Sequence, residues 1–180
     1  MYIYCIFCAT ESCDKVAIAA RELFGCEAIS PKQVQHTWVK GRMIDRVHHL
    51  LPGYVFLYFQ EKVRNIAQFH RVSGVIRCLC DTSKEYELTG DNERFALMLY
   101  HKNGIIGKTK VYQEGQLIRV CRGAFEGLET KVLKVDHRCS RMQIEIPFAM
   151  RPVKTWVEYE IVSPGGQEKE NPLPSLLSEP

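Results

Sequence analysis

The chain has 180 residues, 46% of them hydrophobic and 25% charged, with a formal net charge of +3 at pH 7. That length suits one or two domains with substantial cores. No apolar run approaches the ~20 residues that a membrane-spanning helix needs, so no membrane association is expected. The apolar start, Tyr2–Cys8, lacks a preceding basic segment and soon meets Glu11 and Asp14. It therefore predicts a first strand rather than a signal peptide, and a cytoplasmic protein.

The next helix and strands are predicted from helix-capping residues and from the glycines and proline that end or interrupt regular structure. Thr10 and Ser12 can cap a helix whose apolar residues repeat up to Gly25, which is placed to end it in the left-handed conformation. A second strand is predicted over 27–34, interrupted at Pro31. Residues 34–47 then resemble a hairpin arm, because Gly41 stands where a tight turn needs a positive φ.

The arm carries an excess of positive charge. Between residues 32 and 49 the only acid is Asp45, against the cations Lys32, Lys40, Arg42 and Arg46. Lys40, Arg42 and Arg46 are therefore candidate contacts to nucleic acid. A solvated arm whose charges only maintain solubility is the alternative.

The following stretch, residues 50–59, predicts the central strand of the chain. Pro52 fixes φ and has no N–H to donate, so it belongs at the start of a strand, and Gly53 allows a sharp corner. From Val55 to Phe59 nearly every residue is apolar and either β-branched or aromatic. Such a run is typical of a strand that is buried on both faces.

Alternating elements complete the first half. A short helix is predicted over 62–71, a strand over 75–80, and a helix over 91–102 that begins after Thr89 and buries Phe95, Met98 and Leu99. The element order predicts an α+β sandwich, with helices on an antiparallel sheet, over residues 1–103. Residues 104–113 are interpreted as a linker, which is apolar enough to pack against the domains rather than leave them free to move relative to each other.

From residue 114 the pattern changes to short strands and tight turns. Strands are predicted over 117–121, 130–135, 142–146 and 155–160, which indicates a small five-stranded β-barrel over 114–163. Because a domain of that size has little core, its large apolar residues should all be buried. They are Phe125, Leu128, Val132, Val135, Ile144, Ile146 and Val157. The Pro/Gly/Glu-rich residues 164–180 are expected to be disordered.

The predicted barrel is also net positive. Residues 108–162 contain ten Lys/Arg and seven Asp/Glu, an excess of three. The candidate nucleic-acid contacts in this half are Arg119, Arg122, Lys131, Lys134, Arg138, Arg141, Arg151 and Lys154.

No motif indicates catalysis. The chain has no glycine-rich phosphate loop, nucleophile elbow or His-Glu metal helix, so we expect neither an enzyme nor a cofactor. Its eight cysteines are expected to be reduced thiols. Cys5 and Cys8 have zinc spacing, but on a strand they point to opposite faces, and no matching second pair follows. No metal site is therefore predicted.

Three blocks together resemble the NusG family of transcription elongation factors. The first strand and helix, and the corner Leu51-Pro52-Gly53-Tyr54-Val55, are similar to its NGN domain. The segment from Gly115 to Gly127, followed by Val135-Asp136, is similar to its KOW domain. Ile3 and Leu51 depart from the family, which usually has tryptophan and phenylalanine at those positions, and Ala124 and Thr130 replace a usual proline and glycine.

Details of the sequence resemble a specialised branch of that family. Asn103–Gly107 and Val135–Arg138 are similar to the LoaP-type antiterminators, which act on selected operons as RfaH does. The resemblance implies a monomeric factor that binds the clamp helices and lobe of RNA polymerase and suppresses pausing and termination. The residues that it places at the polymerase are Ile3, Leu51, Pro52, Gly53 and Tyr54.

The ligand of the second half remains open between several candidates. The cations favour an RNA hairpin in a nascent leader transcript, and non-template DNA is a further candidate. A general elongation factor would instead recruit a ribosomal protein or Rho through its KOW domain. Two more alternatives are a ribosome-associated KOW protein that acts without polymerase, and a KOW segment folded as a helical hairpin, which the Val, Ile and Thr content disfavours.

Overall fold

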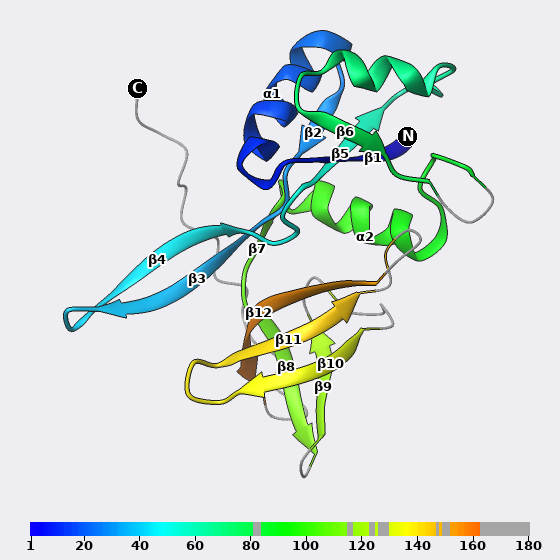
Figure 1. The fold of residues 1–180 in the computed structure, drawn as a ribbon. Helices are drawn as coiled ribbons and strands as arrows, with labels where there is room; N and C mark the ends of the chain where they lie inside the picture. Colours follow the sequence, from blue (N-terminus) through cyan, green and yellow to red (C-terminus); the bar gives the residue numbers. More distant parts are fainter. Residues whose placement is uncertain are drawn as a thin grey trace.

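The structure is a computed structural model (Figure 1). It describes residues 1–80, 84–114, 117–122, 125, 130–146, 148 and 152–162. The side chains of 113, 114, 117–119, 121 and 122 lie outside this description, as do the predicted tail and Leu128. No helix within the described ranges is both long and apolar enough to cross a bilayer.

A four-stranded antiparallel sheet forms the centre of the first half, in the order β2-β5-β1-β6. Its strands are β1 (Tyr2–Cys8), β2 (Glu27–Ile29), β5 (Tyr54–Phe59) and β6 (Val75–Cys78). β5 lies between β1 and β2, and its four middle residues are buried. The prediction of a central strand buried on both faces is therefore confirmed.

Helices cover both faces of this sheet. On one face, Tyr4 and Val55 pack in a cluster with Val16 of α1 (Cys13–Phe24) and Phe69 of the 3₁₀ helix η2 (Ile66–Arg71). α1 ends at Gly25, whose φ of 62° is the predicted left-handed C-cap. On the other face lies α2 (Gly90–His101). Its buried residues are Phe95, Ala96 and Leu99, and Met98, also predicted for this stripe, is partly buried and packs against the same cluster.

The predicted hairpin arm is present and projects from the body of the molecule (Figure 1). It consists of β3 (Lys32–Val39) and β4 (Arg42–His49), joined by a turn in which Lys40 and Gly41 have φ of 49° and 77°. Two consecutive positive φ values are the geometry of a type I′ turn, which suits the twist of a hairpin. β7 (Ile105–Ile106) pairs in parallel with the base of β3.

The second half is a five-stranded sheet, called here the C-terminal sheet, in the order β10-β11-β12-β8-β9. Its strands are β8 (Thr109–Glu114), β9 (Leu117–Arg122), β10 (Lys131–Asp136), β11 (Arg141–Ile146) and β12 (Val153–Ile161). The predicted strands are confirmed, and the helical-hairpin alternative is wrong. Of the predicted core, Phe125, Ile144, Ile146 and Val157 are buried, whereas Val132 and Val135 are partly buried.

The segment interpreted as a linker is mostly strand. β7 joins the arm's sheet, and β8 pairs with β9 and β12 in the C-terminal sheet. The chain therefore passes from one half to the other within Gly107–Lys108, between two hydrogen-bonded strands. This short passage brings the C-terminal sheet against the first half.

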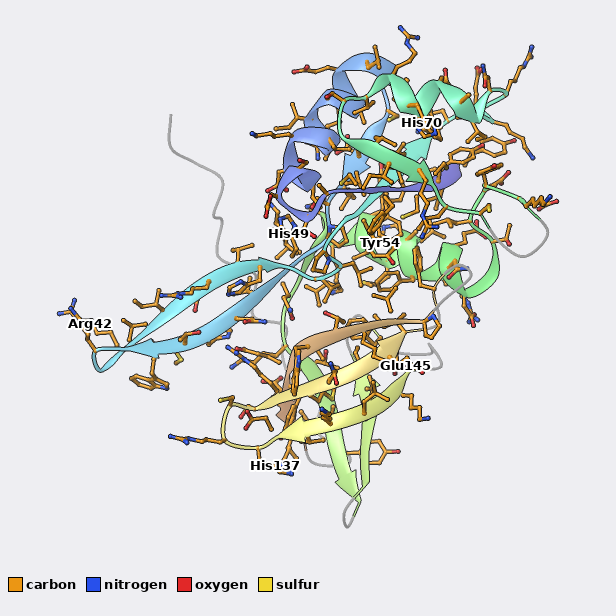
Figure 2. All side chains as sticks on the ribbon, in the orientation of Figure 1. Arg42, His49, Tyr54, His70, His137 and Glu145 are labelled. Carbon is orange, nitrogen blue, oxygen red and sulfur yellow. The ribbon has the colours of Figure 1, made fainter. Side chains whose placement is uncertain are left out.

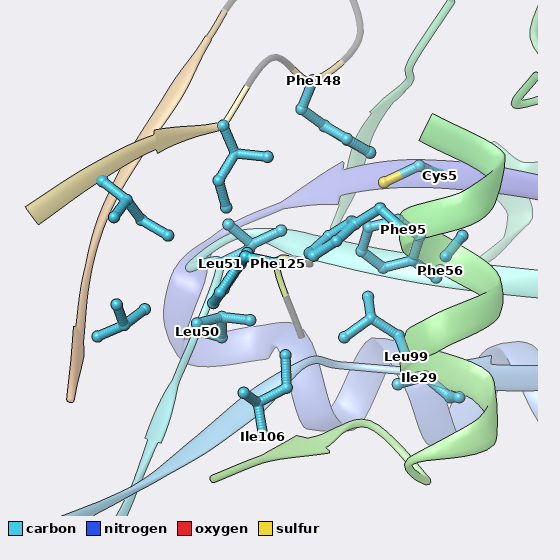
Figure 3. Packing of buried hydrophobic residues seen from close by; sticks show 14 of the residues in the cluster. Cys5, Ile29, Leu50, Leu51, Phe56, Phe95, Leu99, Ile106, Phe125 and Phe148 are labelled. Atoms are coloured by element: carbon cyan, nitrogen blue, oxygen red, sulfur yellow. The ribbon is translucent and has the colours of Figure 1, made fainter. Parts of the chain in front are cut away.

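One apolar cluster joins the two halves. It contains Leu51, Phe56 and Phe95 of the first half together with Phe125 and Phe148 of the second (Figure 3). The Phe148 ring centroid lies 5.4 Å from that of Phe56 and 6.2 Å from that of Phe95, and the Phe125 ring stacks on Phe95 at 6.1 Å. A sheet of this size gains much of its buried area by sharing a core.

The corner before β5 depends on a glycine. Gly53 has φ of +91°, and a Cβ there would lie 2.7 Å from Phe7 Cε2 and 3.0 Å from the carbonyl oxygen of Cys8. We expect Gly53→Ala to lower the free energy of unfolding by about 2–5 kcal/mol, from backbone strain plus overpacking. Gly41→Ala is the matched control, because φ is +77° and nothing lies within 4 Å. Urea denaturation should show a loss of only about 1–2 kcal/mol for it; equal losses would contradict the crowded corner.

The shared core gives a second expectation. Phe148 is only 2% exposed, so Phe148→Ala should lower the free energy of unfolding by about 3–5 kcal/mol. Ile161→Ala, at a β12 residue that is 55% exposed, should change it by no more than ~0.5 kcal/mol. Urea denaturation of both variants compares them. A Phe148→Ala protein as stable as the control would mean that this ring contributes little to joining the halves.

Candidate functional site

Three backbone contacts fix the corner that precedes β5. The Tyr54 N–H donates to the Leu51 carbonyl over 3.2 Å, and the Cys8 N–H donates to the Gly53 carbonyl over 2.8 Å. The Gly53 N–H points at Cys13 Sγ, 3.2 Å away. The backbone of the corner is thereby fixed to the end of β1 and the start of α1.

The predicted polymerase-binding residues gather around this corner, but most of them are covered. Ile3 and Leu51 are each 1% exposed, Gly53 is buried, Tyr54 is half-buried and Pro52 is exposed. Ile3 and Leu51 are therefore buried in this arrangement of the two halves, and the polymerase-binding role of the five residues stays a prediction. The sequence could not show the cover of Tyr54, because Phe148, which packs on it, lies about a hundred positions away.

Aromatic packing covers Tyr54. Its ring meets Phe7 edge-on at 5.3 Å between centroids and Phe148 at 5.8 Å. Burial raises the pKa of the Tyr54 phenol, so the ring stays neutral at physiological pH. Tyr54 thus lies between the N-terminal sheet and a phenylalanine of the C-terminal half.

Hydrogen bonds join β12 to the first half beside the same corner. Thr155 Oγ1 donates to the carbonyl of Leu50 over 2.7 Å in a buried position. Gln33 Nε2, at the base of the arm, donates to the carbonyl of Trp156 over 2.6 Å. Buried bonds of this kind cost free energy when one partner is removed, so they fix the position of β12.

A charged contact lies further along the same boundary. The Glu158 side chain, 5% exposed, accepts from the His36 backbone N–H over 2.7 Å, and its other oxygen lies 2.8 Å from His36 Nδ1. Arg141 Nη2 is 3.8 Å from Glu158, and Asp45 is 3.5 Å from His36 Nε2. We call the contact between His36 and Glu158 the seam contact.

The predicted arm cations are free of acidic partners. Lys40, Arg42 and Arg46 are exposed and form no ion pair with any residue that the structure describes. Arg42 lies at the far end of the arm in Figure 2. Lys32, at the base, pairs with Asp14 at 3.0 Å. The charge excess is therefore concentrated toward the tip.

The cations of the C-terminal half divide into three groups. Lys131, Lys134 and Arg138 are exposed, whereas Arg141 is 29% exposed and directed at Glu158. Lys154 is exposed and lies 3.8 Å from Glu145. The side chains of Arg119 and Arg122, and all of Arg151, lie outside the described residues. Their role in binding nucleic acid stays a prediction.

The cysteines of β1 occupy opposite faces, as predicted, with Cys5 in one core cluster and Cys8 in the other. Burial raises the pKa of the Cys8 thiol to about 12, and Cys13 Sγ lies 3.7 Å from it. Protonated buried thiols are poor metal ligands. Among the described residues no group of three or more His, Cys, Asp or Glu side chains is placed to hold a metal ion.

Sequence reasoning missed the residues that join the halves. No sequence pattern marks His36, Gln33 and Glu158 as contacts between the halves. A single polar side chain in an amphipathic strand is usually solvated, so these three looked like ordinary surface residues. Phe148 could have been suspected, since it is a large apolar residue between the strands predicted over 142–146 and 155–160.

Comparison with known proteins finds no matching family model and no matching curated protein. Among solved structures, the chain is similar to that described as "Domain interaction in Thermotoga maritima NusG". The match has 16% sequence identity and a TM-score of 0.52, and it covers 87% of this chain and 93% of that chain. At this identity the likeness concerns the fold. The chain therefore has a NusG-like fold, built from a mixed α/β half and a C-terminal sheet.

Proposed function

We propose that this protein is a bacterial transcription elongation and processive antitermination factor that binds RNA polymerase through the first half of the chain. The observation that carries the proposal is the corner at Pro52–Tyr54, which borders an apolar sheet face within a NusG-like fold. Large apolar faces are typical of protein interfaces. The expected partners on the polymerase are the clamp helices and the lobe.

Binding there requires the two halves to part. Phe148 packs on Tyr54, and Thr155 is bonded to Leu50, so the C-terminal sheet occupies the position that the polymerase would take. Separation would uncover the rings of Tyr54 and Phe56, on which Phe148 packs, and full burial of a side chain of this kind is worth roughly 1.5–3 kcal/mol. The polymerase restores that burial, which makes exchange of one cover for the other energetically reasonable.

The cations support a nucleic-acid ligand in addition to polymerase. Lys40, Arg42 and Arg46 on the arm, and Lys134 and Arg138 on the C-terminal sheet, are exposed. We propose that they contact the phosphates of an RNA hairpin in a leader transcript, so that the factor acts at selected operons in the manner of the LoaP type. Non-template DNA beside the polymerase is the further candidate for the arm.

The second candidate is a general elongation factor whose C-terminal sheet recruits a ribosomal protein or Rho. The structural match favours it, because the likeness extends over 93% of a NusG chain. Both candidates share the polymerase surface and differ in the ligand of the second half. In either case we propose a cytoplasmic, monomeric protein that is not an enzyme and needs no cofactor.

Polymerase binding tests the shared part of the proposal. Tyr54→Ala should weaken binding to core RNA polymerase of the same organism by about tenfold or more, since central aromatic residues dominate interfaces. Tyr54→Phe is the matched control and should bind as the wild type does, because it keeps the ring. Biolayer interferometry on immobilised core enzyme measures both affinities.

The same assay tests the covering of the corner. Phe148→Ala should bind the polymerase more tightly than the wild type, because it weakens the competing contact within the chain. Circular dichroism confirms that each variant is folded. Unchanged affinity in Tyr54→Ala, with the fold intact, would remove Tyr54 from the polymerase surface.

Salt dependence tests the nucleic-acid part. Each phosphate contact contributes roughly −0.7 to −0.9 to the slope of log K against log salt, so Arg42→Ala with Arg46→Ala should flatten the slope by about 1.4–1.8. Lys15→Ala with Arg64→Ala is the matched control, because both residues are exposed cations on the α1 and η2 side of the molecule. Gel shifts on a leader RNA hairpin across a salt series give the slopes. Equal flattening by both pairs would mean that the arm is not the contact.

A further inference from the structure

The chain has two tryptophans, and both have exposed side chains. Trp38, near the tip of the arm, is 70% exposed, and Trp156, in β12, is 38% exposed. Tryptophan is highly buried on average in folded proteins. An indole left in water on a protruding strand therefore needs an explanation other than packing within the chain.

Trp38 belongs to an apolar face of the arm. The strand register pairs Trp38 with Met43, His36 with Asp45, and Val34 with Val47, so these side chains share one face of the ribbon. Met43 is 55% exposed and Val47 is 51% exposed. The opposite face carries Arg42 and Arg46, which pair with Val39 and Gln35. One face of the arm therefore presents an indole and a thioether beside Asp45, and the other presents guanidinium groups beside Ile44, which is 42% exposed.

Trp156 lies close to the arm across the boundary of the two halves. Side chains two positions apart on a strand point to the same side, so Trp156 shares its side of β12 with Glu158. Likewise Trp38 shares its face with His36. Because a strand advances ~3.3 Å per residue, each indole starts about 7 Å along its own strand from the seam contact. The two tryptophans thus flank the point where the halves touch.

Polar and cationic residues lie near the two tryptophans in the strand register. Gln143 is the cross-strand partner of Trp156, and its amide is partly exposed. Lys134 is in turn the cross-strand partner of Gln143 and is exposed. The turn between Lys40 and Arg42 adds unpaired cations two to four residues beyond Trp38. Aromatic faces among cations and amides match the chemistry of bases on a polyanionic strand.

We propose that Trp38 and Trp156 are stacking platforms for unpaired nucleobases, on opposite sides of the seam contact. The inference rests on the proposed nucleic-acid role of the arm and names the part of the ligand that this surface takes. Paired bases present only their edges, whereas a loop or single strand offers the flat faces that an indole can cover. The cations contact the flanking phosphates, and the Gln143 amide is placed to bond a base edge.

The positive charge of the arm favours a nucleic acid over a protein as the partner of this surface. Tryptophan and methionine are also common at protein interfaces, but there the centre of the patch is depleted of charge. Here Lys40 lies in the turn two residues after Trp38, and Arg42 and Arg46 lie on the opposite face of the same ribbon. None of the three carries an acidic partner among the described residues. Asp45, the one acid of the arm, is already placed against His36 at 3.5 Å. The arm as a whole is thus net positive and complementary to an anion.

The test uses the full chain and its own fluorescence. The probes are a mixed-sequence ten-nucleotide RNA, the DNA of the same sequence, and the blunt RNA duplex. We expect the single strands to quench the tryptophan emission on binding, and the duplex to bind with little quenching. Trp38→Phe and Trp156→Phe each leave one reporter, so both rings can be followed separately. Stronger quenching by RNA than by DNA, or the reverse, identifies which single strand this surface prefers.

Side-chain removal distinguishes stacking from phosphate contact. Trp38→Ala and Trp156→Leu should each weaken single-strand binding by about 5- to 150-fold. The slope of log K against log salt should stay unchanged, because an indole releases no counterions. Trp→Tyr at either site should restore most of the affinity. Ile76→Ala is the control, since Ile76 is an apolar β6 residue that is 57% exposed and lies away from the arm.

The outcomes separate this inference from the proposed function. Salt-dependent binding with no quenching, or full affinity in both tryptophan variants, would overturn the stacking inference while leaving the arm cations as RNA contacts. Equal affinity for the duplex and the single strand would also overturn it. Absence of binding to every nucleic acid would instead remove the nucleic-acid role itself. Emission that responds to core polymerase alone would show a protein-docking face and overturn the inference.

Discussion

The structure depends on one apolar interface, in which Phe148 packs against Tyr54, Phe56 and Phe95. A five-stranded sheet of short strands buries little area alone, and without the C-terminal half the rings of Tyr54 and Phe56 would lose the cover that Phe148 gives them. Each half therefore supplies the cover that the other needs. The polar contacts at Thr155 and Glu158 set the register of this cover, because they leave only one position of β12 in which buried donors and acceptors are paired.

Local patterns in the sequence predicted most of the strands and helices. Pro52-Gly53 marked the start of β5, Gly25 marked the end of α1, and Gly41 marked the turn of the arm, each because backbone geometry there restricts the residue type. The segment 104–113 was misjudged for the opposite reason. Two of its pairing partners, the base of β3 and the end of β12, lie far away in sequence and leave no local signal. The third, β9, follows β8 directly, and this hairpin pairing was overlooked.

The residues of the candidate site could be predicted from the sequence, but whether they are exposed or buried could not. The corner at Leu51–Tyr54 could be identified from the sequence, as could the cations of the arm. Whether the corner is exposed depends on the packing of Phe148, about a hundred residues away, and no periodicity reports such a contact. The same holds for Arg141, which counts as a surface cation in the sequence yet lies 3.8 Å from the buried Glu158 in the structure.

The two proposed ligands make opposite demands on the interface between the halves. A polymerase surface at Tyr54 requires Phe148 to move away, whereas a nucleic acid that stacks on both Trp38 and Trp156 uses the arrangement fixed by His36 and Glu158. Each ligand can shift the equilibrium only by its differential affinity for the two arrangements. The coupling between the two ligands is reciprocal. A nucleic acid bound across the seam contact therefore weakens polymerase binding by a certain factor, and bound polymerase weakens nucleic-acid binding by the same factor. The interface at Phe148 is therefore the element that would couple the binding of the two ligands.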